Sequence, residues 1–174
     1  MQPTRTLTAH CTLSHPADGQ PLLTINNEHA KAEISLFGAH VLRYQRHGEP
    51  ASLWLSDKAV LDGSKPIRGG IPLCWPWFGP APARVGSGKP AHGFARTSLW
   101  TLDGVSDHGD GTLVHLSLRD TDASRALWPH AFELELDVLV GKELSLVLTT
   151  RNTGKTPLTY NAALHTYLQI SAPE

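Results

Sequence analysis

Apolar and polar residues alternate with a period of two in several segments of this chain. The alternation covers residues 32–37, 41–44, 112–118, 132–138 and 144–149. Successive side chains of a strand point to opposite faces of the sheet, so this period is typical of strands that place one face in a core and the other in water. Several such strands separated by turn signals predict an all-β fold, either a sandwich or a barrel.

Two of these strands are predicted to form a hairpin. Gly141 and Lys142 separate the strands predicted over residues 132–140 and 143–151, and a glycine-containing pair between alternating segments is a tight-turn signal. A further strand is predicted over residues 158–170.

Helical sequence is scarce in this chain. Thr121 or Asp122 is placed to cap a short helix that runs through Leu127, and Pro129 would end it. No repeat and no low-complexity linker interrupts the sequence. Residues 1–174 are therefore predicted to form a single β-sandwich domain.

The charge of the chain is almost balanced, with 15 Lys and Arg against 16 Asp and Glu. A nucleic-acid-binding or membrane-surface protein needs a basic face, so we expect neither partner.

The first residues lack the apolar run of a secretory signal, and no apolar stretch approaches the ~20 residues of a membrane helix. Cys11 and Cys74 fit no metal or redox motif. We expect them to be buried or partly buried thiols of a cytoplasmic protein.

One segment departs from the strand pattern. Residues 63–93 contain seven of the chain's 15 glycines and six of its 13 prolines. Proline lacks an N–H group and fixes φ, so this segment cannot form a regular helix or a central strand. It also carries Trp75, Trp77 and Phe78, and Trp54 lies just upstream. A rigid loop with aromatic residues on a β scaffold is typical of a binding site, although Pro and Trp could simply cover one end of the sandwich.

Common nucleotide, hydrolase and metal motifs are absent from the sequence. The run from Gly86 to Lys89 resembles part of a phosphate-binding P-loop, but Ala83 replaces its first glycine and Pro90 replaces its Ser or Thr. The sequence also contains neither G-x-S-x-G nor H-E-x-x-H. We expect no metal site.

Two histidines and two arginines are the candidate site residues. His92 ends the Gly- and Pro-rich loop, and His165 lies in a predicted strand, where a histidine is more often structural than catalytic. Imidazole nevertheless titrates near pH 6.5, which suits proton transfer. Arg68 precedes two glycines, and Arg96 follows His92 by four residues. A guanidinium beside glycine can bind a phosphate bidentately, so the set indicates a phosphorylated, ring-shaped ligand.

At these positions the sequence resembles a known family, the hexose-6-phosphate mutarotases. These are the glucose-6-phosphate 1-epimerases of the aldose 1-epimerase superfamily. The resemblance is carried by Ile67–Pro80 (IRGGIPLCWPWFGP), His92–Arg96 (HGFAR), Leu164–Tyr167 (LHTY), Gly38–His40 (GAH) and Leu53–Ser56 (LWLS). The motifs occur in the family's order from about residue 34 to residue 168.

The resemblance implies a galactose-mutarotase-like β-supersandwich. It also implies interconversion of the α and β anomers of hexose 6-phosphates, without a metal or an organic cofactor. His165 matches the general acid that protonates the ring oxygen, and His92 matches the second active-site histidine, which orients the sugar. Arg68 and Arg96 match the phosphate-binding arginines.

The sequence departs from this family in one respect. The family's general base is a glutamate on a strand of the C-terminal portion, and no acidic residue here stands in a matching context; Glu174 is not an adequate substitute. We therefore expect the chain to be the N-terminal part of a mutarotase, without its C-terminal strands and with little activity alone. Exposed sheet edges then predict self-association or pairing with a complementing C-terminal segment.

The sequence leaves two other functions open. A non-catalytic module that binds carbohydrates or phosphosugars would keep the arginines and the aromatic loop; the missing glutamate favours it, and the two histidines disfavour it. A structural β domain without a ligand is the third reading, and the dense motif of residues 67–80 argues against it.

Overall fold

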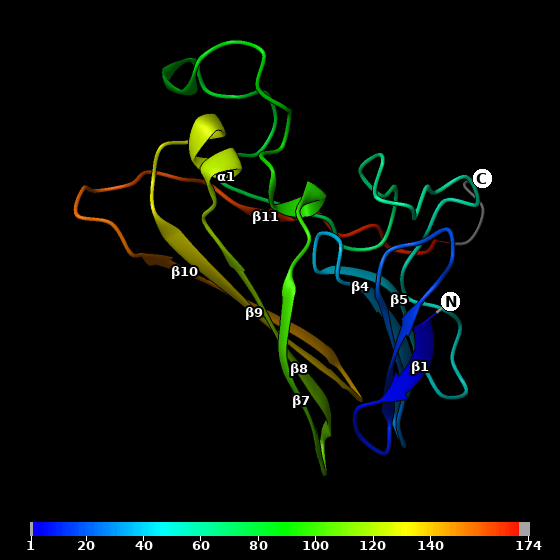
Figure 1. Ribbon diagram of the computed structural model, residues 1–174. Helices are drawn as coiled ribbons and strands as arrows, with labels where there is room; N and C mark the ends of the chain where they lie inside the picture. Colours follow the sequence, from blue (N-terminus) through cyan, green and yellow to red (C-terminus); the bar gives the residue numbers. More distant parts are fainter. Residues whose placement is uncertain (1, 171–174) are drawn as a thin grey trace.

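The computed structural model describes residues 2–170, which form two antiparallel β-sheets and a small two-stranded one (Figure 1). The first sheet has the strand order β1-β2-β3-β4-β5. Its strands are β1 (Gln2–Thr6), β2 (Cys11–His15), β3 (Leu22–Asn26), β4 (Ala30–Ser35) and β5 (His40–Arg46). The second sheet has the order β10-β9-β8-β7. Its strands are β7 (Thr101–His108), β8 (Gly111–Arg119), β9 (Phe132–Gly141) and β10 (Leu144–Asn152).

The period-two pattern produces these strands in the predicted way. In β9, every second residue from Phe132 to Val140 is buried, and the residues between them are only partly buried. The next strand, β10, pairs back onto β9 after a two-residue turn, with Leu144 opposite Val140. The predicted hairpin and the all-β fold are both confirmed.

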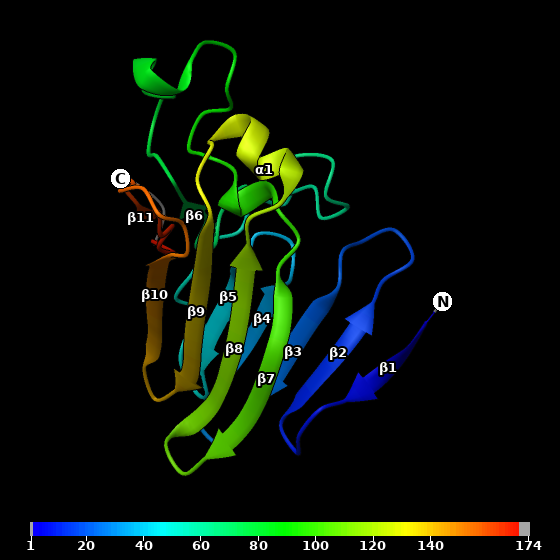
Figure 2. The same ribbon diagram turned by 60° about the vertical axis from the view of Figure 1, so that its left-hand side comes forward.

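The two large sheets share one hydrophobic core. Leu23, Ile25 and Ile34 of the first sheet belong to the same buried cluster as Leu136 and Val138 of the second. In Figure 2 the second sheet lies in front of the first. Polar contacts also cross this interface, because the buried Tyr44 hydroxyl donates to the Gly141 carbonyl at 2.9 Å.

A short α-helix, α1 (Asp122–Leu127), joins β8 to β9. Thr121 caps it: its hydroxyl accepts the Ser124 amide, and the Ser124 hydroxyl accepts the Thr121 amide in return. This reciprocal capping satisfies backbone donors that an uncapped first turn would leave free. The predicted helix is confirmed, with Thr121 as the cap.

The strand predicted over residues 158–170 is wrong. Only β11 (Ala163–Leu164) forms there, and it pairs with β6 (Leu73–Cys74). The segment does run beside residues 70–76, but prolines stand at both 72 and 76 of that partner. Proline cannot donate to a ladder, so regular pairing is limited to Leu73 and Cys74, two of the three residues between them.

Residues 63–93 cover one end of the sandwich. Trp75 is buried there between the sheets, with ring centroids 4.6 Å from Phe132, 5.1 Å from Trp128 and 5.7 Å from Phe94. The loop also contains the short 3-10 turn Ala83–Val85, and a second turn, Ala95–Thr97, follows it. Both cysteines are free and buried, as expected.

Candidate active site

The loop of residues 63–93 turns back so that His92 lies against Phe78 and Gly79. The His92 amide donates to the Gly79 carbonyl at 2.7 Å, and the Gly79 amide donates to His92 Nδ1 at 3.1 Å. His92 has a φ of 64°, in the left-handed region that residues with a side chain rarely adopt. Reciprocal hydrogen bonds therefore hold the imidazole in a fixed orientation.

The same contacts define the protonation of this imidazole. Because Nδ1 accepts a hydrogen bond, the neutral His92 ring carries its hydrogen on Nε2. Burial lowers the pKa of His92, and the positive charges of Arg96 and His165 lower it further. At neutral pH His92 is thus a neutral ring whose Nε2–H is the group left to donate to a ligand.

The second histidine, His165, reaches the same place from a distant part of the chain. It follows β11, and its amide donates to the Pro72 carbonyl at 3.0 Å. Its ring centroid lies 6.2 Å from that of His92, with the two planes nearly perpendicular at 83°. The structure therefore brings together two predicted site residues that are far apart in sequence.

Aromatic rings surround the two histidines. Phe78 lies 4.9 Å from His92 and 5.6 Å from His165, measured between ring centroids. Tyr167 stacks on His165 at 5.0 Å, and Trp54 continues the row at 5.9 Å from Tyr167. These five side chains form a continuous aromatic row at the end of the sandwich. Phe78 is 47% exposed, so part of the row faces solvent.

Two tryptophans of the loop do not contribute to this row. Trp75 and Trp77 belong to the aromatic loop that was predicted to form a binding site, but they are only 0% and 1% exposed. Large apolar rings remove the most apolar surface from water when they enter the core, which favours their burial. The interpretation that tryptophan covers one end of the sandwich is correct for these two residues.

Arg96 lies beside His92. It sits in the turn Ala95–Thr97, and its Nη2 donates to the Ala91 carbonyl at 3.0 Å. Its charge also acts on the buried His40, whose pKa it helps to lower. The Arg96 Nε atom is buried and has no hydrogen-bond partner among the described residues. The guanidinium therefore places a positive charge next to the histidine pair.

Arg68 lies on the same end of the molecule but is exposed. Its carbonyl accepts the Ser56 amide at 3.1 Å, and the neighbouring Gly70 carbonyl accepts the Tyr167 amide at 2.9 Å. Its guanidinium makes no hydrogen bond or ion pair with residues 2–170. The backbone thus ties Arg68 to the aromatic row, while its side chain is available to a ligand.

Two contributors to the site were not predicted individually. Asn161 Oδ1 accepts the Phe78 amide at 2.6 Å and so holds the exposed phenyl ring over the histidines. His40 is fully buried beneath the Arg68 turn. The Gly38–His40 motif was a sequence signal for His40, whereas Asn161 had no signal beyond its closeness to His165.

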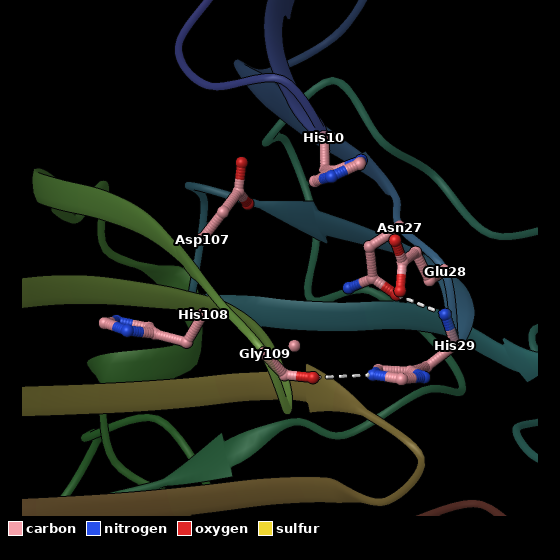
Figure 3. A pocket seen from close by; sticks show the side chains of 8 residues that line it. His10, Asn27, Glu28, His29, Asp107, His108 and Gly109 are labelled. Carbon is pink, nitrogen blue, oxygen red and sulfur yellow. Dashed lines mark hydrogen bonds between the residues drawn. The ribbon is translucent and has the colours of Figure 1, made fainter.

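A separate polar pocket of about 230 Å³ lies at the other end of the sandwich (Figure 3). His29 Nε2 bonds the Gly109 carbonyl there at 3.2 Å, and the His29 amide donates to Asn27 Oδ1 at 2.9 Å. β9 begins next to the buried Trp75 and ends next to this pocket, so about 30 Å separates the two places. The histidines of this pocket are therefore remote from His92 and His165.

Within residues 2–170, no three His, Cys, Asp or Glu side chains are placed to hold a metal ion. The described helices also include none that is long and apolar enough to cross a membrane.

Comparisons with known proteins agree with the resemblance. A family model described as "Aldose 1-epimerase" matches residues 21–174. An Escherichia coli (strain K12) protein named "Putative glucose-6-phosphate 1-epimerase" is 37% identical over 153 residues, which are 88% of this chain and 50% of that protein. A Cenchrus ciliaris protein with the same name is 36% identical over 149 residues, covering 80% and 44%. This chain spans about half the length of these relatives.

Solved structures place the fold in the same group. The crystal structure of a "putative mutarotase" from Salmonella typhimurium has a TM-score of 0.88 and 33% identity, over 97% of this chain and 55% of that one. A galactose mutarotase-like protein from Lactobacillus casei has a TM-score of 0.59 at 24% identity, over 75% and 44%. The predicted galactose-mutarotase-like fold is confirmed.

Proposed function

Because this chain belongs to the aldose 1-epimerase family, we propose that its site serves to interconvert the α and β anomers of a hexose 6-phosphate, with glucose 6-phosphate as the first candidate. One observation carries the proposal: His92 and His165 lie 6.2 Å apart between ring centroids, next to the positive charge of Arg96. The names of the Escherichia coli and Cenchrus ciliaris relatives support the phosphorylated substrate.

The chemistry requires two proton transfers. Ring opening breaks the bond between C1 and the ring oxygen while the C1 hydroxyl becomes a carbonyl. One group removes the hydroxyl proton and another delivers a proton to the ring oxygen. Rotation about the C1–C2 bond and the reverse transfers then close the ring on the other face, so no proton is consumed overall. An acid and a base on opposite sides of the sugar meet this requirement.

The residues take roles that fit their surroundings. His165 protonates the ring oxygen, and His92 donates its Nε2–H to a sugar hydroxyl, which orients the ring. Arg96 and Arg68 bind the phosphate, since guanidinium groups match phosphate oxygens bidentately. The exposed part of Phe78 packs against the apolar face of the sugar.

A second candidate function is a non-catalytic phosphosugar-binding module that uses the same residues. One observation favours it: among residues 2–170, the charged groups that act on the pKa of His92 are Arg96 and His165, and no carboxylate is among them. Glu174 lies outside the described residues. Both candidates share the phosphate site, and they differ in whether the chain accelerates ring opening.

Exchange NMR of glucose 6-phosphate distinguishes the two candidates, because the anomers give separate signals. A mutarotase accelerates the exchange, and His165→Ala reduces the acceleration about 100-fold or more, the usual contribution of a general acid. The matched control His108→Ala changes an exposed histidine at the far end of the sandwich and keeps the rate.

The outcomes are separable. Binding of glucose 6-phosphate without acceleration, lost in Arg68→Ala, would establish the binding module instead. Acceleration that survives His165→Ala would refute the role of His165. If the chain neither binds nor converts glucose 6-phosphate, both candidate functions are wrong.

We also propose that a β-rich segment covers strand β10, which is an edge of its sheet. An apolar groove of about 340 Å³ lies between Leu144 and Leu146 of β10 and Leu164 and Leu168 of the last described stretch. Leu168 is 66% exposed. An unpaired edge beside exposed leucines pairs readily with another strand. This chain matches 55% of the Salmonella typhimurium protein, and the part that it does not match is the candidate partner.

Co-expression with the unmatched part of the Salmonella typhimurium protein tests this partner. Light scattering should detect a one-to-one complex, and Leu146→Lys should weaken it by placing a charge in the groove. A homodimer of this chain through the same groove, or a monomer in every mixture, would contradict the proposal.

A further inference from the structure

His40 is the first residue of β5 and is 0% exposed. Its Nε2 donates to the Gly69 carbonyl at 2.7 Å. Its ring also packs against Gly70, where an added Cβ would lie only 2.9 Å from His40 Nε2. Gly70 has a φ of 62°, so both its backbone conformation and its neighbour require glycine. The buried His40 ring therefore packs against Gly69 and Gly70 and stabilises the turn that carries Arg68.

The hydrogen bond to Gly69 leaves the other ring nitrogen as an acceptor. A carbonyl oxygen only accepts, so Nε2 carries the hydrogen and His40 Nδ1 presents a lone pair. This Nδ1 is buried and has no hydrogen-bond partner within residues 2–170. A buried polar atom without a partner is uncommon and calls for a physical reason.

A complementary unpaired atom lies nearby on the other arginine. Arg96 Nε is a donor, and it is also buried without a partner in the described part of the chain. The residues just before β5 pack against the backbone of Arg96. The Gly38 amide donates to the Ser98 carbonyl at 2.7 Å, and an added Cβ on Gly38 would lie 2.7 Å from the Arg96 carbonyl oxygen. The charge of Arg96 also acts on His40.

We propose that His40 is a positioning residue that links the two arginines of the phosphate site. Its Nε2–H fixes the backbone of the Arg68 turn, and its Nδ1 accepts the Arg96 Nε–H when a phosphate engages the terminal nitrogens of Arg96. The inference rests on the proposed function in one respect, namely that the ligand is phosphorylated.

This arrangement has a consequence for selectivity. The guanidinium is planar by itself, and a hydrogen bond at Nε fixes the direction in which its two terminal nitrogens point, which favours bidentate binding of a phosphate. The sugar itself contacts the aromatic row and not His40. Loss of His40 should therefore weaken the binding of glucose 6-phosphate and leave the weak binding of unphosphorylated glucose unchanged.

Three substitutions separate the two contacts of His40. His40→Gln keeps an N–H near the Nε2 position, His40→Asn keeps an oxygen acceptor near the Nδ1 position, and His40→Phe removes both. NMR titration of each variant with glucose 6-phosphate and with glucose should show a loss in the phosphosugar affinity of about 10- to 100-fold for His40→Phe, the usual effect of losing a charged hydrogen bond. Gln and Asn should each retain part of the affinity, so the test does not depend on His40→Phe folding.

Two further measurements distinguish positioning from general support of the fold. The matched control Tyr44→Phe removes a buried hydrogen bond from the same strand and should lower stability without changing the preference for phosphate. In a double-mutant cycle, His40→Gln and Arg96→Lys should be non-additive in phosphosugar affinity, because glutamine loses the acceptor at the Nδ1 position and lysine lacks the Nε–H.

The failure of this inference differs from the failure of the proposed function. If wild-type protein prefers glucose 6-phosphate and His40 variants keep the full preference, or the cycle is additive, the positioning role is wrong while the phosphate site stands. If wild-type protein shows no preference for glucose 6-phosphate over glucose, the phosphate site and the role of His40 are both wrong.

Discussion

Substitution of Asn27 by alanine should destabilise the protein strongly, because this one side chain joins the two sheets. Asn27 follows β3 and is 8% exposed. Its Nδ2 donates to the Val140 carbonyl at 2.7 Å and to the Thr112 hydroxyl at 3.1 Å, both in the opposite sheet. Its Oδ1 accepts the amides of Ala30 at 3.0 Å and His29 at 2.9 Å.

The magnitude follows from these four hydrogen bonds. A buried hydrogen bond contributes about 1 kcal/mol net, and a buried partner left alone costs more than an exposed one. The His29 amide lies at a partly exposed turn, so water replaces most of its bond. The remaining three bonds predict a loss of about 3 kcal/mol for Asn27→Ala, a large part of the 5–15 kcal/mol typical of a domain.

Urea denaturation, followed by tryptophan fluorescence, measures this change. Asn27→Asp is the matched variant: it keeps Oδ1 but places a carboxylate oxygen against the Val140 carbonyl. The pKa of this aspartate should rise in the folded state, so Asn27→Asp should lose stability relative to wild type as the pH increases from 4 to 7. A loss below 1 kcal/mol for Asn27→Ala, or no pH dependence for Asn27→Asp, would refute the view that Asn27 joins the sheets.

Three other predictions concern pH, the aromatic row and the helix. Burial lowers the pKa of His40 to about 4. The hydrogen bond to Gly69 opposes this shift, and the charge of Arg96 adds to it. Below about pH 6.5 the His40 imidazole of the unfolded chain therefore binds a proton that the folded chain does not bind. When the pH falls from 7 to 5, the free energy of unfolding of the wild type should decrease by about 2 kcal/mol more than that of His40→Gln, as measured by urea titration. Phe78→Ala should weaken glucose 6-phosphate binding about 3- to 10-fold in NMR titrations, since an aromatic contact contributes about 0.5–1.5 kcal/mol; an unchanged affinity would exclude Phe78 from the site. Thr121→Ala should lower the unfolding free energy by about 1 kcal/mol through loss of the helix cap, and a change within 0.2 kcal/mol would contradict that role.

Strands β8, β9 and β10 of the second sheet were predicted from the sequence, whereas several of the other strands were not. Strand β9 alternates between buried and partly buried residues along nearly its whole length, and β8 and β10 alternate over shorter stretches. Strands β1, β2 and β3 are only five residues long. They were not predicted, because a short strand offers too few alternations to stand out. The strand β7 (Thr101–His108) was also missed, since it contains no fully buried residue.

The candidate site was only partly predictable. Of its four main residues, Arg68 and His92 stand out because they lie beside glycines, and all four stand out because their motifs resemble a family. The neighbours of these residues did not stand out. Asn161 and Phe78 are 83 positions apart, and their contact depends on how a proline-rich loop crosses the end of the sandwich. Which tryptophans are buried depends on the same crossing.

The sequence by itself determined the all-β class, the β9–β10 hairpin and the capped helix, and it supplied the candidate site residues, because period, turn chemistry and motifs are local properties. Only the tertiary structure decided that His92 and His165 meet, that Trp75 and Trp77 belong to the core, and that residues 158–170 form two paired residues instead of a strand. These outcomes depend on long-range partners. A side chain's environment is set by the segments packed against it, and a strand forms only where its neighbour can return the hydrogen bonds.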